Sequence, residues 1–377
     1  MKTTPFIYGK IAKEYEFTNR TKDIEYLSSN FRGLINTTII SPRRWGKTSL
    51  VNRVAEIFEN DSQYFVCKLD VFNCRTQEQF YSSFANAILN ASSTGWDDFV
   101  AAAKKYLSRF LPNVSLSDAA KSYELSFGVD FKSSQLSIDE ILDLPHQIAN
   151  EKGRKFIVCI DEFQNISNYE DSLGFQQKLR AHWQHHNNVC YCLYGSKRHM
   201  LLDIFNNYQM PFYKFGDIHF LDKISREDWV SFISQRFRDT GKDISDDLCG
   251  LIADKVKNHP YYVQQLSQQV WLRTENASTE DIVIESFENL INQLSLLFTN
   301  IIDTLTAKQI SFLVAVAKGE RNFSSKHVLD SYQLGTSANI KNLKKVALDK
   351  DIIDIFTDNK MEFQDPIFEY WVLNYYL

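Results

Sequence analysis

The stretch Ser41-Pro42-Arg43-Arg44-Trp45-Gly46-Lys47-Thr48-Ser49 decides the fold, because it has the form of a phosphate-binding loop. The residues before it, 36–40, are mostly β-branched and apolar and predict a strand. The residues after it, 49–58, carry apolar side chains at helical spacing. In a strand, loop and helix of this kind, backbone N–H groups at the start of the helix bind phosphate. The sequence therefore predicts a nucleotide site at this position.

Each residue of the loop has an expected role. Lys47 would contact the β- and γ-phosphates, and the Thr48 hydroxyl would bind Mg²⁺. Gly46 lacks a Cβ and would let the backbone approach the phosphates. The first position of the pattern G-x-x-x-x-G-K-[ST] is Ser41, and Pro42 favours an extended Ser41, so we expect the turn to form. The candidate nucleotide-binding residues are Ser41, Pro42, Arg43, Arg44, Trp45, Gly46, Lys47, Thr48 and Ser49. The other interpretation is an ordinary strand-to-helix turn that contains Gly-Lys-Thr.

A second motif supports the nucleotide interpretation. Residues 155–160 form a nearly continuous apolar run, which is typical of a central parallel strand buried on both faces. The run ends in Asp161 and Glu162, at the edge of the sheet where ligands bind in such folds. Asp161 would hold Mg²⁺, and Glu162 would polarise the attacking water. The alternative is that both carboxylates only cap the next helix.

Further polar residues follow another predicted strand, 188–194. At its end lie Gly195, Ser196, Lys197 and Arg198, whose polar and basic groups would read the γ-phosphate. Arg198, or less favourably Lys197, would stabilise charge in the transition state. The alternative is a loop with ordinary surface charges. His182, His185 and His186 lie on neighbouring helical turns, and we expect them on a solvated surface rather than around a metal, since no Cys or acidic residue has matching spacing.

Composition limits the possible classes of protein. The chain has 377 residues, 44% of them hydrophobic, and a net charge of −5. This charge argues against nucleic-acid binding over the whole surface but allows a local basic patch. No stretch has the length of a membrane-spanning helix, and the N-terminus lacks the apolar core of a signal peptide. The six cysteines include no C-x-x-C pair, so we expect buried thiols in a cytoplasmic protein.

The order of predicted elements divides the chain into three parts. Residues 1–222 would form an α/β core with a lead-in and an inserted strand or hairpin at about 95–135. In this part, Ser137 would cap a helix over 138–151, which Pro145 would kink or interrupt. Residues 223–299 would form a helical lid. Residues 300–377 read as three helices and a hairpin with its turn at 357–359, the order of a winged helix.

The winged-helix region allows two kinds of partner. Its third helix and the end of that helix carry Lys341, Lys344, Lys345 and Lys350, which would face a DNA major groove. Against this, residues 300–377 contain nine Lys/Arg and ten Asp/Glu, a net charge of −1. This nearly neutral charge is unusual for a DNA-binding surface and favours a contact with protein.

Together these segments resemble a large prokaryotic group of predicted ATPases, the archaeal-type AAA-like P-loop ATPases related to the STAND NTPases. The resemblance covers nearly the whole chain and rests on the following motifs: Pro5-Phe6-x-Tyr8-Gly9, Phe17-x-x-Arg20, the loop 41–49, Ile160-Asp161-Glu162-Phe163-Gln164, Gly195-Ser196, His259-Pro260-Tyr261-Tyr262 and Asp365-Pro366-Ile367-Phe368.

The resemblance implies an α/β fold with an ASCE-type parallel sheet of order 5-1-4-3-2, a helical lid and a C-terminal winged helix. It places Pro260 in the lid motif that contacts adenine, although Asn258 and His259 stand where a glycine is common. It also places Arg198 at the sensor position after the fourth core strand. The implied cofactors are ATP and Mg²⁺.

Three functions follow as hypotheses. The first is an Mg²⁺-dependent ATPase that acts as a nucleotide-driven switch or assembly, through a protein partner or self-association. The second is an ATP-dependent DNA-binding regulator or initiator-like protein that reads DNA with the winged helix. The third is a scaffold that keeps ATP as a structural ligand without hydrolysing it.

Overall fold

The computed structural model describes residues 4–12, 17–107, 114–119, 122–127, 135–356 and 360–376. The chain forms two compact units. The first, here called the sheet unit, comprises Arg20–Ser41 and Lys47–Leu221. The second, here called the helical unit, comprises Met1–Asn19, Pro42–Gly46 and Asp222–Leu377. Each unit has its own cluster of buried apolar side chains.

The sheet unit is built on five strands that pair in parallel, in the spatial order β2-β5-β6-β1-β7. If the core strands β1, β2, β5, β6 and β7 are numbered 1 to 5 in chain order and the sheet is read from the β7 edge, the order is 5-1-4-3-2. This is the order that the family resemblance implies. The strands are β1 (Thr37–Ile40), β2 (Tyr64–Asp70), β5 (Lys155–Asp161), β6 (Val189–Gly195) and β7 (Asp217–Phe220). All residues of β1 and β6 are buried, as expected for strands covered on both faces.

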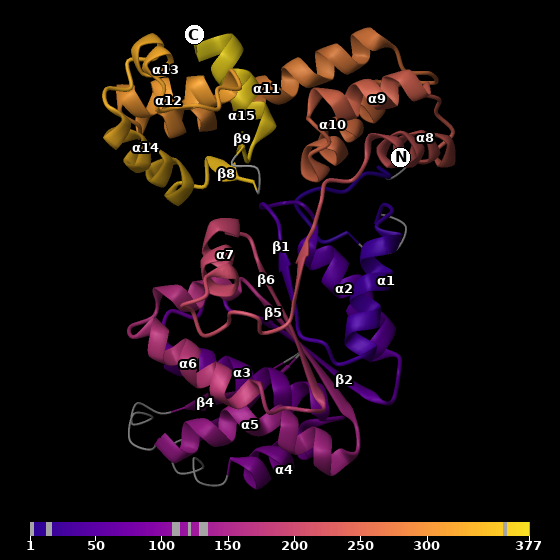
Figure 1. The fold of residues 1–377 in the computed structure, drawn as a ribbon. Helices are drawn as coiled ribbons and strands as arrows, with labels where there is room; N and C mark the ends of the chain where they lie inside the picture. The colour runs from indigo at the N-terminus through magenta and orange to yellow at the C-terminus, as the bar shows by residue number, and fades with distance from the viewer. Residues whose placement is uncertain are drawn as a thin grey trace. The chain divides into compact units, whose positions relative to one another are not determined.

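Helices cover both faces of this sheet. Figure 1 shows α1 (Thr21–Arg32) and α2 (Lys47–Glu59) on one side and α3 (Gln77–Ser92), α5 (Gln135–Lys152) and α6 (Ser172–Trp183) on the other. Right-handed crossovers require this division, because the chain moves along the sheet in one direction through α2 and returns through α3, α5 and α6. The sheet unit also contains the 3₁₀ helix η4 (Phe163–Asn168) and α7 (Arg198–Asn206).

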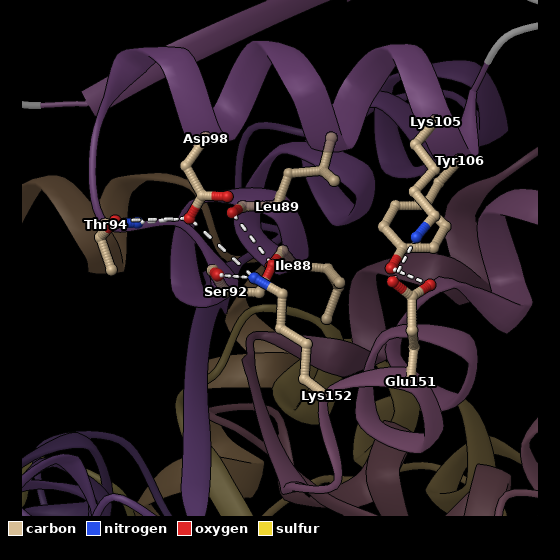
Figure 2. Close-up of polar contacts among 9 residues, drawn as sticks. All are labelled: Ile88, Leu89, Ser92, Thr94, Asp98, Lys105, Tyr106, Glu151 and Lys152. Carbon is tan, nitrogen blue, oxygen red and sulfur yellow. Dashed lines mark hydrogen bonds and ion pairs between the residues drawn. The ribbon is translucent and has the colours of Figure 1, made fainter.

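The inserted segment contains α4 (Trp96–Tyr106) and an antiparallel hairpin of β3 (Val114–Ala119) and β4 (Ser122–Phe127), so the predicted hairpin is confirmed. Polar contacts fasten α4 to α5 at both ends (Figure 2). At the start of α4, Lys152 of α5 pairs with Asp98, and it also donates to the carbonyl of Ser92, the last residue of α3, at 2.8 Å. At the other end of α4, Lys105 and the Tyr106 hydroxyl both bind Glu151.

Two details of α5 differ from the prediction. The helix begins at Gln135, so Ser137 lies inside it, and the predicted cap concerns a side chain outside the described part of the structure. Pro145 also lies within the helix and does not interrupt it. Burial of Ile141, Leu144 and other apolar side chains holds the helix together and compensates for the missing hydrogen bond.

The helical unit begins with four helices: α8 (Arg226–Asp239), α9 (Asp246–Lys255), α10 (Pro260–Arg273) and α11 (Glu280–Asp303). Ser225 caps α8 by accepting from the backbone N–H of Asp228. The N-terminal segment joins this bundle, because the Phe6 ring packs against Phe232 and Phe237.

The end of the helical unit has the order of a winged helix. It comprises α12 (Ala307–Ala317), α13 (Lys326–Ser331), α14 (Ser337–Asp349), the antiparallel strands β8 (Ile353–Ile355) and β9 (Met361–Phe363), α15 (Pro366–Trp371) and a π-helical turn (Val372–Tyr376). Three helices followed by a hairpin confirm the prediction, while the predicted turn at 357–359 lies outside the described residues. No helix in the described ranges is both long enough and apolar enough to cross a bilayer.

Candidate nucleotide site

The candidate phosphate loop joins the end of β1 to the start of α2. Ser41 follows β1 and is fully buried, and Lys47 is the first residue of α2. The Lys47 ammonium donates to the Ser41 carbonyl at 3.0 Å and to its Oγ at 3.1 Å. Serine in place of the usual first glycine therefore supplies an acceptor for this lysine. Lys47 is only 6% exposed, so its charge is held close to the end of the sheet.

Gly46 is required by its backbone conformation. Its φ is +90°, a region in which residues with a Cβ are strained, whereas a Cβ added there would meet nothing within 4 Å. Arg44 also has a positive φ of 64°. Two left-handed residues in this short loop turn the backbone sharply before α2 begins.

The end of β5 meets the first turn of α2. The Thr48 hydroxyl donates to Asp161 Oδ2 at 2.7 Å, although the two residues are 113 positions apart. Asp161 Oδ1 also accepts from the backbone N–H of Glu162 at 2.8 Å. A hydroxyl beside a carboxylate is a pair of oxygen ligands suited to Mg²⁺. The sequence predicted both residues as metal ligands, and the structure brings them into contact.

Asp161 has an unusual electrostatic environment. Burial is the largest influence and raises its pKa to about 6, against the lowering effect of its hydrogen bonds with Thr48 and Glu162. The nearby carboxylates of Glu162 and Asp70 raise it further. A buried carboxylate that faces neutral donors and other acids gains free energy when a cation binds, so the donor set fits a divalent metal ion.

Glu162 is held by hydrogen bonds that the sequence did not predict. Its backbone is left-handed, with φ 54°, and its Oε2 accepts from the Gln164 amide. The same oxygen accepts from the Ser196 hydroxyl at 2.9 Å and from the Ser196 backbone N–H at 3.4 Å. In the sequence, Ser196 is one of several polar residues that follow β6. It lies beside Glu162 in the structure because β5 and β6 are neighbouring strands.

Arg198 begins α7 and is 5% exposed. Its guanidinium lies over the ring of Phe220, 5.4 Å from the centroid. The structure therefore places this candidate at the same sheet edge as Ser196, with its charge against an aromatic ring.

The residues between Ser41 and Lys47 make their contacts within the helical unit. The Arg44 guanidinium lies 4.6 Å from the centroid of Tyr261 in α10. The Trp45 ring lies 6.4 Å from that of Phe356, which directly follows β8, and Lys223 lies over Trp45 at 5.5 Å. The loop thus touches both a lid helix and the hairpin of the winged helix.

Pro260 is the first residue of α10 and is buried. His259 before it is 3% exposed and its Nδ1 has no hydrogen-bond partner among the described residues. Burial lowers the pKa of His259 to about 3, so its ring is neutral. A cavity of about 430 Å³ lies beside it, with lining residues that include Arg43, Arg44, Tyr262 and Asp365.

The prediction that His182, His185 and His186 lie on a solvated surface was wrong for His182, at the end of α6, and for His186, just after it. His186 is buried and His182 is largely covered, and both bind Asp143 Oδ1 of α5, at 3.0 and 2.8 Å. The ring of His146 stacks on His186 with centroids 4.9 Å apart. The packing of α5 against α6 creates this cluster, which no spacing along one helix reveals. The described residues contain no group of three or more His, Cys, Asp and Glu side chains that could hold a metal ion.

The comparisons with known proteins bear on the fold of the chain. Residues 296–374 match a family described as "Probable winged helix domain". The Walker-type ATPase PABY2304 of Pyrococcus abyssi has a similar structure, with TM-score 0.68, 15% identity, and coverage of 98% of this chain and 100% of that one. The chain therefore shares the overall fold of that ATPase, an α/β core with a parallel five-stranded sheet followed by a C-terminal winged helix.

A second similar structure is the ORC2 protein of Aeropyrum pernix, solved in ADPNP and ADP complexes. Its TM-score is 0.56, its identity to this chain is 14%, and the match covers 98% of each chain. At these identities the likeness concerns the fold. No curated protein matches the sequence.

Proposed function

We propose that this protein binds Mg·ATP and hydrolyses it to ADP and phosphate. The observation that carries the proposal is the meeting of Lys47, the Thr48–Asp161 pair and Glu162 at one edge of the parallel sheet. Lys47 and Thr48 come from the start of α2, and Asp161 and Glu162 from the end of β5. Each has the chemistry that phosphoryl transfer needs.

The residues divide the work as follows. Lys47 would exchange its Ser41 contacts for the β- and γ-phosphates, and the backbone at the start of α2 would donate to the same oxygens. Thr48 and Asp161 would hold Mg²⁺, which supplies charge neutralisation at the phosphates. Glu162 would take a proton from the attacking water, and Arg198 would stabilise the charge that develops on the γ-phosphoryl group. The loop residues 42–46, Ser49 and Pro260 remain candidate nucleotide-binding residues.

We also propose that nucleotide state controls the winged helix, acting on a protein partner or on a second copy of the chain. The contacts of Arg44 with Tyr261 and of Trp45 with Phe356 support this. A phosphate that reorders the loop would alter both contacts, and so the position of the lid helix and the hairpin.

The test is Mg·ATP binding and turnover by wild type, Lys47→Ala and Glu162→Gln, at low and high protein concentration. We expect Lys47→Ala to lose binding, and Glu162→Gln to keep binding while turnover falls by roughly 10²- to 10⁴-fold. Wild-type turnover per molecule that rises with concentration would indicate an assembling ATPase. Binding of ATP that is recovered intact, without turnover, would contradict hydrolysis and favour the scaffold.

DNA binding is a second candidate function, because Lys341 and Lys345 are exposed on α14, the third helix of the winged helix. It predicts binding to duplex DNA that weakens with salt and falls when Lys341, Lys344 and Lys345 are replaced by glutamine. Since Lys344 also covers the ring of Phe323, the folding of that variant is checked by thermal melting. Absence of binding at low salt would remove this candidate.

A further inference from the structure

Gln164 is a buried polar side chain for which the function above gives no role. It lies in η4, two residues after Glu162, and is 1% exposed. Its amide N–H₂ donates to Glu162 Oε2, while its Oε1 has no hydrogen-bond partner in the described structure. A buried acceptor without a partner costs about 1–3 kcal/mol, so an apolar residue of the same size would be better tolerated by the fold.

The neighbouring strand is shaped to admit this amide. A Cβ added to Gly195, at the end of β6, would lie 1.8 Å from Gln164 Oε1 and 3.2 Å from the Cα of Glu162. Gly195 does not have a positive φ, so it is space and not backbone conformation that excludes a side chain there. The gap at Gly195 is therefore filled by the Gln164 side chain.

The hydrogen bonds on Glu162 fall on one oxygen. Oε2 receives the Gln164 amide, the Ser196 hydroxyl and the Ser196 backbone N–H, and these are the hydrogen bonds that the Glu162 carboxylate makes with described residues. A carboxylate oxygen with three donors is fixed in place, while the other oxygen of the same group keeps its lone pairs for a proton.

We propose that Gln164 is a positioning residue for ATP hydrolysis, which it serves by fixing Glu162 Oε2 so that Oε1 faces the attacking water. In the reaction, Oε1 takes a proton from the water as its oxygen bonds to the γ-phosphorus, and the bond to the β–γ bridging oxygen of ADP breaks. The proton then passes from Glu162 to the released phosphate or to solvent. This inference rests on the proposed ATPase function.

The first test replaces Gln164 by methionine, which keeps the volume and removes the donor. We expect kcat for ATP to fall about tenfold or more, because a misplaced base loses much of its effect, while KM and nucleotide affinity stay within twofold. The matched control is Gln176→Met on α6. Gln176 is also a fully buried glutamine with both amide atoms unpartnered among the described residues, and it makes no hydrogen bond to Glu162. This control should leave kcat within twofold.

The second test is a double-mutant cycle with Gly195→Ala. In the wild-type background the added Cβ displaces the Gln164 amide, so kcat should fall about as far as in Gln164→Met. In a Gln164→Ala background the clash with the amide is gone and only the 3.2 Å contact with the Glu162 Cα remains, so Gly195→Ala should lower kcat by a clearly smaller factor than in wild type. Such non-additivity shows that Gly195 acts through Gln164.

The outcomes distinguish a failure of the positioning role of Gln164 from a failure of the proposed ATPase function. Wild-type turnover with an unchanged kcat in a folded Gln164→Met protein overturns the inference alone. Equal losses of kcat in Gln164→Met and Gln176→Met, or a loss of nucleotide affinity that matches the loss of kcat, assign Gln164 a merely structural role and also overturn it. A wild type without turnover overturns the ATPase function, and the positioning role with it.

Discussion

Two carboxylates of the sheet unit, Asp143 and Asp161, show how partners decide the charge state of a buried acid. Burial is the largest influence on both and in each case favours the protonated form. Hydrogen bonds from His182 and His186 more than offset burial at Asp143 and hold its pKa well below the usual range. Asp161 has neutral donors and acidic neighbours, and its pKa is raised to about 6.

The comparison separates an aspartate whose histidine partners are in place from the aspartate that we propose as a Mg²⁺ ligand. Asp143 already has two imidazole partners, His182 in α6 and His186 just after it, and so links α5 to the end of α6. Asp161 stands beside Thr48 at the sheet edge where Mg²⁺ would bind. Substituting each aspartate by asparagine, which keeps the shape, tests this difference directly.

The largest expected effect is on turnover. Asp161→Asn should lower Mg²⁺-dependent ATP turnover by about 100-fold or more, because a metal ligand at the phosphates is lost. Asp143→Asn should leave turnover within twofold. Steady-state phosphate release at saturating Mg·ATP measures both variants. Comparable losses in the two would contradict the assignment of Asp161 to the metal.

The next effect is on stability, where the two substitutions should have opposite signs. At pH 8 without Mg²⁺, Asp161→Asn should raise the free energy of unfolding by about 1–3 kcal/mol, since a buried charge with a pKa about two units high is removed. Asp143→Asn should lower it. Urea denaturation followed by circular dichroism measures both, and a destabilised Asp161→Asn would show that this carboxylate already has a stabilising partner.

The stabilisation by Asp161→Asn should depend on pH. Because the pKa of Asp161 is higher in the folded than in the unfolded protein, the folded state binds more protons between about pH 4 and 6, and wild-type stability falls as pH rises through that window. The advantage of the asparagine variant should therefore be full at pH 7.5 and shrink toward pH 5. Unfolding curves at pH 5, 6 and 7.5 test this, with Asp143→Asn as the reference that should not follow the same course.

The smallest effect concerns Asp143 itself, which is partly exposed. Its hydrogen bond raises the pKa of His182, so their pairing contributes most below pH 6.5 and is lost as pH rises through the raised value. Asp143→Asn should cost about 0.5–1 kcal/mol at pH 6 and less at pH 8.5. Urea midpoints at the two pH values measure the difference. A cost that grows with pH would mean that the ion pair with His182 is not what holds α5 to α6.

Much of the fold could be predicted from the sequence, and so could the position of Lys47, Thr48, Asp161 and Glu162 at one edge of the sheet. The loop 41–49 and the run ending in Asp161 and Glu162 carry local signals: an apolar strand, a glycine before lysine, and carboxylates at the end of a buried run. These signals can be read from the sequence because each of them depends only on residues that are close together in the chain. The winged helix was predictable for the same reason, from three helices and a short hairpin.

Other features depend on strand order and helix packing, which no short stretch encodes. The pairing of β5 with β6 brings Ser196 to Glu162, and the space at Gly195 admits the Gln164 amide. The packing of α5 on α6 places Asp143 between His182 and His186, where the sequence alone favoured solvated histidines. The sequence by itself determined which residues could do the chemistry, because local motifs set backbone shape and residue type. Only the tertiary structure decided how Glu162 is oriented and which acids have partners, because those contacts join segments that the chain keeps far apart.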